Sequence, residues 1–177
     1  MLNGPSEAPP NASPGAGTAL VVVDVDTNQM TVDSTFFGLT GTTTASHIHC
    51  CTATPGTGTA GVTTTTPTFA GFPLGVTAGN FTSTLDLGAA STYNPAFVTS
   101  SGSIANARSA LLAGLNAGTS YFNIHTTTFG GGEIRGFLRP LAAVPEPGTL
   151  ALLGAGLLGI ALVARRQPRD AAVRLAA

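Results

Sequence analysis

Residues 120–138 read SYFNIHTTTFGGGEIRGFL, and the fold of the chain can be worked out from this stretch. Apolar and polar side chains alternate over Ser120–Thr126 and again over Glu133–Leu138, which is the two-residue period of a β-strand. Three consecutive glycines at 130–132 lie between the two segments. We therefore predict a hairpin of two strands joined by a glycine-rich loop.

Four further segments have the same period and are separated by turns rich in Gly, Thr and Pro. The clearest one places Val21, Val23 and Val25 on one face. One stretch instead repeats its apolar residues at helical spacing and ends in glycines. The predicted elements are strands at Ala19–Val25, Met30–Phe37, Ala45–Cys51 and Phe81–Leu87 and a helix at Ser103–Leu115. Many short strands with frequent turns predict an all-β fold with one short helix, as a sandwich or a Greek-key barrel.

The composition is typical of extracellular β-proteins, in which uncharged Thr and Ser cover the exposed faces. Charged residues make up only 8% of the 177 residues, and lysine is absent. Typical soluble proteins contain ~25% charged residues. The formal net charge is −1, and only Arg108, Arg135 and Arg139 precede the C-terminal region. Nucleic acid is therefore not an expected partner, because its binding depends on clustered Lys and Arg.

The C-terminal region differs in character from the rest of the chain. A linker at residues 141–148 contains Pro145, Glu146 and Pro147. Two prolines flanking one residue exclude a helix interior or a central strand. An uncharged stretch, Thr149–Ala164, comes next, and an arginine pair, Arg165 and Arg166, follows it directly.

The uncharged stretch has sixteen residues, and a helix of that length rises only ~24 Å, short of the ~30 Å hydrocarbon core of a bilayer. A C-terminal helix packed in the core is the alternative, but such a helix should have a polar face, and this stretch has none. We therefore predict a single hydrophobic helix, inserted in the membrane through residues 149–164, with its arginines on the cytoplasmic side. The predicted domains are a β-domain at residues 1–140, the linker at 141–148 and a transmembrane-type tail at 149–177.

Pro-Glu-Pro, an apolar span and an arginine cluster, in this order, resemble the bacterial PEP-CTERM sorting signal. The resemblance implies an exported protein that is anchored in the inner membrane and then placed at the cell surface or released. It also implies an exosortase-type processing enzyme as a partner, often in bacteria that produce exopolysaccharide. Such proteins carry an N-terminal signal peptide. Residues 1–4, MLNG, are neither basic nor apolar, so we expect the signal peptide to be missing from this sequence because its start was assigned too late.

Five motifs in the β-domain resemble those of the CHRD domain, the module named after chordin. They are LNGPSEAPP at 2–10, FGLTG at 37–41, ASHIH at 45–49, YFNIHT at 121–126 and GEIRGFL at 132–138. The resemblance covers residues 2–140 and implies an immunoglobulin-like β-barrel without an established enzymatic activity. Chordin binds growth factors, so a protein ligand is a further partner to consider.

All three histidines of the chain lie within these motifs. In a strand, His47 and His49 point to the same side, and His125 lies on the polar face of its own strand. If the two strands are neighbours, the three imidazoles converge, which predicts a zinc or copper site. Cys51 is a candidate fourth ligand if the first strand continues that far. The sequence favours, over this metal site, a buried hydrogen-bond network with Glu133 and Arg135 as partners.

The two cysteines, Cys50 and Cys51, are adjacent in the sequence. Adjacent residues of a strand face opposite sides, which argues against a bond between them. We therefore expect two free thiols, one of them in the core.

No catalytic motif accompanies these residues, because the sequence contains no nucleophile elbow, P-loop or dinucleotide fingerprint. We expect no enzymatic activity and no catalytic residues. The leading hypothesis is a structural or binding protein of the cell envelope or extracellular matrix. A metal-binding protein that uses His47, His49 and His125 is the alternative, and a module for a protein ligand is a third hypothesis.

Overall fold

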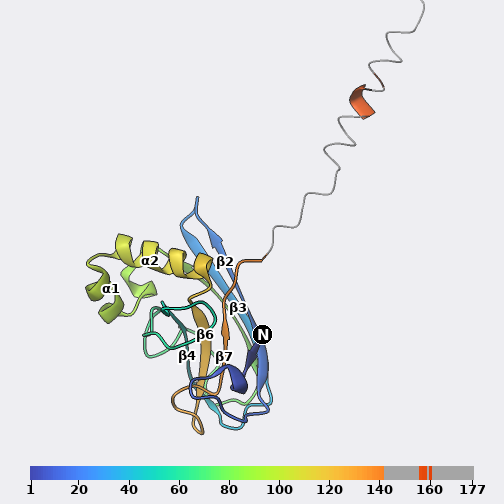
Figure 1. Cartoon of the computed structure of the whole chain (residues 1–177), viewed down its shortest axis with the longest axis vertical. Coiled ribbons are helices and arrows are strands. Elements are labelled where there is room, and N and C mark those ends of the chain that lie inside the picture. Colours follow the sequence, from blue (N-terminus) through green and yellow to red (C-terminus); the bar gives the residue numbers. More distant parts are fainter. Residues whose placement is uncertain (142–155, 159, 161–177) are drawn as a thin grey trace, which may run out of the picture. The chain divides into compact units, whose positions relative to one another are not determined.

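The computed structural model describes residues 1–141, 156–158 and 160. Met1–Pro140 forms one compact unit that is mostly β (Figure 1). Its strands are β1 (Leu2–Asn3), β2 (Ala16–Asp24), β3 (Gln29–Phe37), β4 (Thr43–His49), β5 (Gly79–Asp86), β6 (Tyr121–Thr126) and β7 (Ile134–Phe137). They pair antiparallel in one sheet with the order β4-β6-β7-β1-β2-β3-β5. All six strands predicted from the alternation are present, and the short β1 is an addition.

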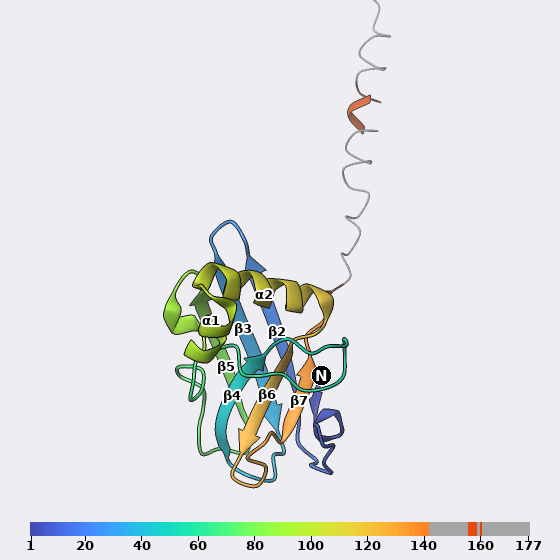
Figure 2. The ribbon, with the colours of Figure 1, turned by 60° about the vertical axis from the view of Figure 1, so that its left-hand side comes forward.

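The sheet is curled, and the chain between β4 and β5 lies along the free edge of β4 (Figure 2). Backbone amides and carbonyls of this segment complete the hydrogen bonding of that edge strand. The bonds run from Thr63 N to Ile48 O at 2.9 Å, from Phe69 N to Ser46 O at 3.2 Å and from Thr43 N to Val76 O at 2.8 Å. The prediction of a mainly β fold is confirmed, but the strands of residues 1–141 form one sheet and not two packed sheets. A loop, in place of a second sheet, covers the edge that would otherwise be exposed.

Two α-helices, α1 (Pro95–Ser101) and α2 (Ile104–Ala117), and two short 3₁₀ helices, η1 (Gly4–Ser6) and η2 (Ala90–Thr92), accompany the sheet. The predicted helix corresponds to α2, which Ser103 caps by accepting a hydrogen bond from Asn106 N. Its left-handed C-cap is Gly118, with φ 68°. The prediction of one helix was wrong, because α1 was missed.

The core lies on one face of the curled sheet. Ile48, Phe122, Ile124 and Ile134 of β4, β6 and β7 are fully buried there, and Leu111 of α2 is buried with them. Burial of each such side chain stabilises the fold by about 1.5–3 kcal/mol. Because side chains alternate along a strand, the neighbouring polar residues of β4, β6 and β7 point to the opposite face.

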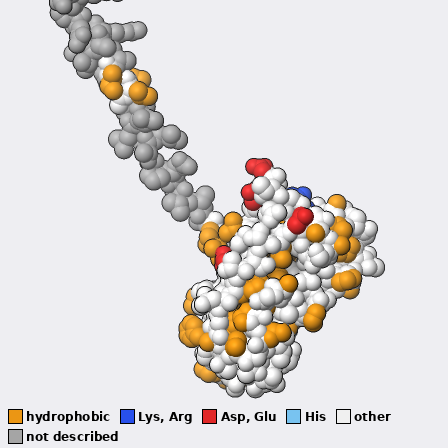
Figure 3. All heavy atoms as spheres, turned by 180° about the vertical axis from the view of Figure 1, so that it is seen from behind, with side chains coloured by type: hydrophobic (Ala, Val, Ile, Leu, Met, Phe, Trp, Pro, Cys, Tyr) orange, Lys and Arg blue, Asp and Glu red, His pale blue; other side chains and the backbone are white. Residues whose placement is uncertain are grey.

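The outer face of β2, β3 and β5 carries threonines, aspartates and several apolar side chains, and Figure 3 shows orange apolar patches among the white polar surface. Thr31 of β3 and Thr84 of β5 are bonded through their hydroxyls at 3.0 Å. Leu20 and Val22 of β2 are exposed by 44% and 50%. Threonines thus share this face with exposed apolar side chains, so uncharged polar residues cover only part of it.

The sorting residues Pro145, Glu146, Pro147, Arg165 and Arg166 lie outside the described residues. Most of the predicted membrane segment 149–164 does too, except residues 156–158 and 160, which are helical. Within residues 1–141, 156–158 and 160, no helix combines the length and the hydrophobicity needed to cross a membrane.

Candidate metal centre

The three histidines lie on the outer face of β4 and β6, opposite the core. Antiparallel pairing places His47 beside Asn123, His49 beside Tyr121, and Ala45 beside His125. The two strands are neighbours in the sheet, as the predicted convergence requires. The strand pairing thus brings side chains from distant parts of the sequence onto one polar face.

The rings of His47, His49 and His125 form one cluster. Their centroids are 5.3 Å apart for His47 and His125, 5.9 Å for His47 and His49, and 6.0 Å for His49 and His125. One ring nitrogen from each residue lies within 4.8 Å of the corresponding nitrogens of the other two. His47 and His49 are buried, with 6% and 7% of their surface exposed, while His125 is half-buried.

Each ring is oriented by one backbone carbonyl. His47 Nε2 bonds Pro67 O at 2.7 Å, His49 Nδ1 bonds Ala60 O at 2.9 Å, and His125 Nδ1 bonds Gly130 O at 3.0 Å. A carbonyl oxygen only accepts, so the bonded nitrogen must be the protonated one. In the neutral ring the second nitrogen then holds a free lone pair.

These second nitrogens have no partner of their own. His47 Nδ1, His49 Nε2 and His125 Nε2 are buried and form no hydrogen bond with any residue of the described part of the chain. A hydrogen-bond network therefore accounts for only one of the two nitrogens of each ring. The partners of these bonded nitrogens are backbone carbonyls, and not Glu133 or Arg135. Buried polar atoms are nearly always hydrogen-bonded, so three unpartnered nitrogens in one place are unusual.

The surroundings keep the three rings neutral. Burial lowers the pKa of His47 and of His125, although the carbonyl bonds oppose this effect. Burial lowers the pKa of His49 further, to about 4, and the nearby His125, His47 and Arg135 add to the shift. At neutral pH each imidazole is therefore uncharged, with one protonated nitrogen and one free lone pair, which is the form that binds a metal.

Residues 50–78, between β4 and β5, form a covering segment. This segment supplies two of the three orienting carbonyls, those of Ala60 and Pro67. In Figure 2 it passes in front of β4, β6 and β7. The third carbonyl, from Gly130, belongs to the predicted glycine-rich hairpin loop. The local sequence predicted this hairpin, but nothing in it indicated which carbonyls would face the histidines.

Tyr121 and Arg135 border the cluster, and of these two the sequence had indicated only Arg135, as a hydrogen-bond partner. The Tyr121 ring stacks on His49, with centroids 4.6 Å apart and planes 9° apart. The guanidinium carbon of Arg135 lies 4.7 Å from the centre of the Tyr121 ring, on a neighbouring strand. Arg135 pairs with Glu7 at 3.8 Å and donates to Gly58 O at 3.0 Å. Tyr121 and Arg135 lie in predicted strands, but only the pairing of β6 with β7 shows that the two side chains are neighbours.

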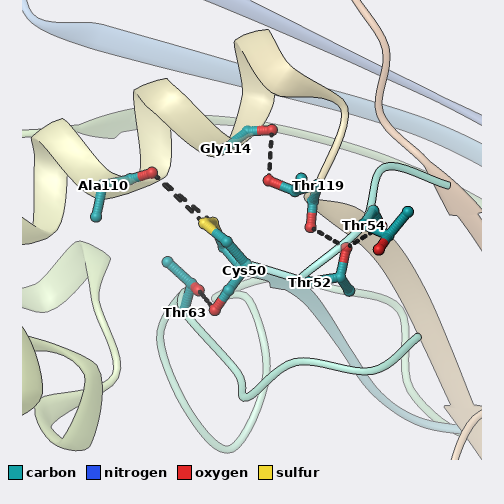
Figure 4. The surroundings of a disulfide bond; sticks show 8 residues. Cys50, Thr52, Thr54, Thr63, Ala110, Gly114 and Thr119 are labelled. Atoms are coloured by element: carbon teal, nitrogen blue, oxygen red, sulfur yellow. Dashed lines mark hydrogen bonds between the residues drawn. A yellow bond between two sulfur atoms is a disulfide. The ribbon is translucent and has the colours of Figure 1, made fainter. Parts of the chain in front are cut away.

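Cys50 and Cys51 form a disulfide with each other (Figure 4), so the expectation of two free thiols was wrong. The prediction failed because β4 ends at His49, and strand alternation no longer governs the residues that follow. Both sulfurs lie near the carbonyl oxygen of Ala110 in α2, at 3.8 Å and 3.6 Å. Cys51 is not part of the histidine group, and a sulfur in a disulfide is not a thiolate ligand. Cys50 is buried in the core, as expected for one of the two.

Comparison with known proteins gives two matches and confirms both resemblances. Residues 1–138 match the family model of the CHRD domain. Residues 143–167 match the model of the PEP-CTERM protein-sorting motif. No curated protein matches the chain, and no solved structure matches it.

Proposed function

The chain belongs to the CHRD domain family, and on this premise we propose that its β-domain is a non-enzymatic, metal-binding module of the cell envelope or extracellular matrix. The PEP-CTERM motif indicates an exported protein that is sorted by exosortase, with membrane anchoring before display at the cell surface. Association with exopolysaccharide or with a protein ligand is part of the proposal. The metal would be zinc or copper, held by His47, His49 and His125.

The observation that carries the metal-binding proposal is the set of three unpartnered ring nitrogens. Each imidazole is fixed by a carbonyl at its other nitrogen. Metal-bound histidines almost always have such an outer partner, because it sets the tautomer and the direction of the lone pair. The carbonyls, the burial and the neutral rings together provide three preoriented nitrogen donors.

One ring nitrogen from each histidine lies close enough to those of the other two to fit one ion after a small adjustment. Three atoms that all lie within 4.8 Å of one another have a common point no more than about 2.8 Å from each. Bonds from imidazole nitrogen to zinc measure about 2.0–2.1 Å. Each ring would therefore move by less than about 1 Å, which a small change of side-chain torsions provides.

A non-enzymatic role is supported by the surroundings of the acidic side chains. Within the described residues, no carboxylate or thiolate joins the histidine group. Glu133 accepts hydrogen bonds from the Ser13 and Thr126 hydroxyls and from the backbone amides of Thr40 and Gly41. Histidine is the side chain most often used in general acid–base catalysis, and in this proposal the free nitrogens of all three histidines bind the metal instead.

We also propose that the curled sheet is a barrel of the immunoglobulin-like or Greek-key type. The curl of the sheet and the hydrogen bonds between the covering segment and β4 support this barrel assignment.

The metal-binding proposal is tested with full-length protein in detergent micelles. After incubation with Zn(II) or copper and gel filtration, we expect about one ion per chain by elemental analysis and a higher melting temperature, because a ligand of the folded state stabilises it. The His47→Ala, His49→Ala and His125→Ala variants should lose both effects. Asn80→Ala, an exposed position on β5, is the control and should retain them. Absence of stoichiometric metal from the original chain would contradict the proposal.

A further inference from the structure

We infer that the candidate metal centre selects monovalent copper, Cu(I), over zinc and holds it with His47 Nδ1, His49 Nε2 and His125 Nε2. This inference rests on the proposed function, because it requires that the three histidines bind a metal at all. It adds the identity of the ion and its coordination number.

The first argument is the charge of the surroundings. Within residues 1–141 the metal group contains three imidazoles and no anionic ligand. A positive charge borders the cluster, because the Arg135 guanidinium lies on the Tyr121 ring that stacks on His49. The carboxylate partner of Arg135 is Glu7, at 3.8 Å. The centre therefore lacks the negative charge that would compensate a divalent cation.

The cost of moving an ion from water into such surroundings rises with the square of its charge. A divalent ion therefore loses about four times as much solvation free energy as a monovalent ion of the same size. Anionic ligands usually offset this cost at buried zinc sites that use thiolates or carboxylates. Here the ligands are neutral and two of the three are buried, so the charge term favours Cu(I).

The second argument is the number of donors. Structural zinc sites are almost always four-coordinate with protein ligands. The residue best placed in the sequence to be a fourth ligand is Cys51, and its sulfur is bonded to Cys50. The three nitrogens are thus the complete donor set that the described residues offer. Zn(II) has a filled d-shell too, and at a site with three histidines it takes a water as its fourth ligand, whereas the lower charge of Cu(I) makes three neutral donors sufficient.

The geometry is compatible with a trigonal ion. Three nitrogens around one ion at about 2.0 Å are spaced by about 3.5 Å in a plane. The three ring nitrogens lie within 4.8 Å of one another. Two of the rings come from positions 47 and 49 of β4, and the third comes from β6. A small inward movement of the rings therefore encloses the ion between the two strands.

The test compares Cu(I) and Zn(II) on the full-length chain in detergent micelles. Ascorbate is used as the reductant, because it reduces Cu(II) without thiol exchange and leaves the Cys50–Cys51 disulfide intact. Competition with the chromogenic chelator bicinchoninate measures Cu(I) affinity, and a zinc-sensitive chromophoric chelator measures Zn(II) affinity. We expect one Cu(I) per chain, bound at least 100-fold more tightly than Zn(II), and three nitrogen neighbours at about 2.0 Å in X-ray absorption.

Two variants examine the origin of this preference. His125→Gln removes the half-buried ligand with little loss of packing, and it should weaken Cu(I) binding at least 100-fold while circular dichroism shows the same fold. Arg135→Gln removes the positive charge and should narrow the ratio between Cu(I) and Zn(II) affinity. Asn80→Ala is the control and should change neither affinity.

The outcomes separate this inference from the proposed function. Zn(II) binding as tight as Cu(I) binding at the histidines overturns the inference and leaves the proposed function in place. Binding of neither ion overturns both. Cu(I) binding that His125→Gln does not weaken overturns the assigned location.

Discussion

Gly114 is the residue that allows the disulfide to pack against α2. A Cβ atom at this position would overlap the sulfurs of Cys50 and Cys51 and would lie 2.8 Å from Ser120 Oγ. The glycine is inside a helix, where alanine would otherwise be preferred by roughly 1 kcal/mol. Its presence is therefore explained by the contact and not by the helix.

We predict that Gly114→Ala destabilises the domain by about 1–3 kcal/mol, because the added methyl group overpacks a buried contact. Urea unfolding followed by circular dichroism measures the change. Gly61→Ala is the matched control, since nothing lies within 4 Å of a Cβ atom placed there. Equal stability of the two variants would show that the disulfide does not occupy this position.

Glu7 is a second residue whose surroundings have a measurable consequence. Its carboxyl is buried, and burial raises its pKa to about 7, although Arg135 opposes the shift. Glu7 Oε1 and Asn123 Oδ1 both lack a hydrogen-bond partner within the described chain, and both lie within 2.8 Å of a Cβ atom placed on Gly132. Burial without a partner for Glu7 Oε1 favours the protonated, uncharged form of the carboxyl.

The sign of the resulting pH dependence follows from linkage. Folding raises the pKa of Glu7 from 4.5 to about 7, so the folded chain holds the proton more tightly between these pH values. The contribution of Glu7 to the free energy of unfolding is therefore complete below pH 4.5 and falls as the pH rises toward 7.

We predict that Glu7→Gln, which keeps a donor at this position at every pH, removes this decline. The difference in melting temperature between pH 5 and pH 8 should be smaller in the variant than in the original chain. Asp26→Asn, at an exposed position, is the control and should leave the difference unchanged. A parallel pH profile for Glu7→Gln would contradict the assignment.

At the scale of elements, the sequence contains a helix-start signal for α1 that the prediction did not use. Asn94 caps the helix by accepting a hydrogen bond from Ala96 N at 3.0 Å, and Pro95 is the first helical residue. Gly102 ends the helix in the left-handed conformation, with φ 83°. Asn followed by Pro, with Gly seven residues later, is a recognisable start and stop. The helix was not predicted because the apolar residues of this short segment show only a weak helical period.

We predict that Asn94→Ala costs about 1–2 kcal/mol of stability, because it removes the helix cap and the 3.1 Å bond from Asn94 Nδ2 to Val62 O. Ser103→Ala, which removes only the cap of α2, should cost about 1 kcal/mol or less. Thermal unfolding of both variants measures the difference. A smaller loss for Asn94→Ala than for Ser103→Ala would mean that the contact with the covering segment does not contribute.

At the scale of the whole molecule, Met1–Pro140 contains the complete sheet, both helices and the histidine cluster. We predict that a chain of residues 1–140 folds by itself. Circular dichroism should show a mainly β spectrum and one cooperative thermal transition, as expected for a single small domain. A disordered spectrum would mean that the C-terminal region contributes to the core, and the full-length chain in micelles is the control.

The amino-acid sequence by itself determined the features that depend on local period and composition. Alternation located β2 to β7 to within a few residues, and it placed His47 and His49 on one face. The motifs identified the CHRD domain and the PEP-CTERM signal. Strand direction and side-chain alternation are properties of the backbone over a few residues, so they can be read without knowing what packs against them.

Only the tertiary structure decided which strands are neighbours and what covers them. β4 and β6 meet although Ser46 and Asn123 are 77 positions apart, and this pairing brings His125 to the other two histidines. The orienting carbonyls come from loops, and the disulfide depends on β4 ending at His49. Pairing and loop position follow from burying the combined apolar face of the whole sheet, so no local stretch of sequence contains that information.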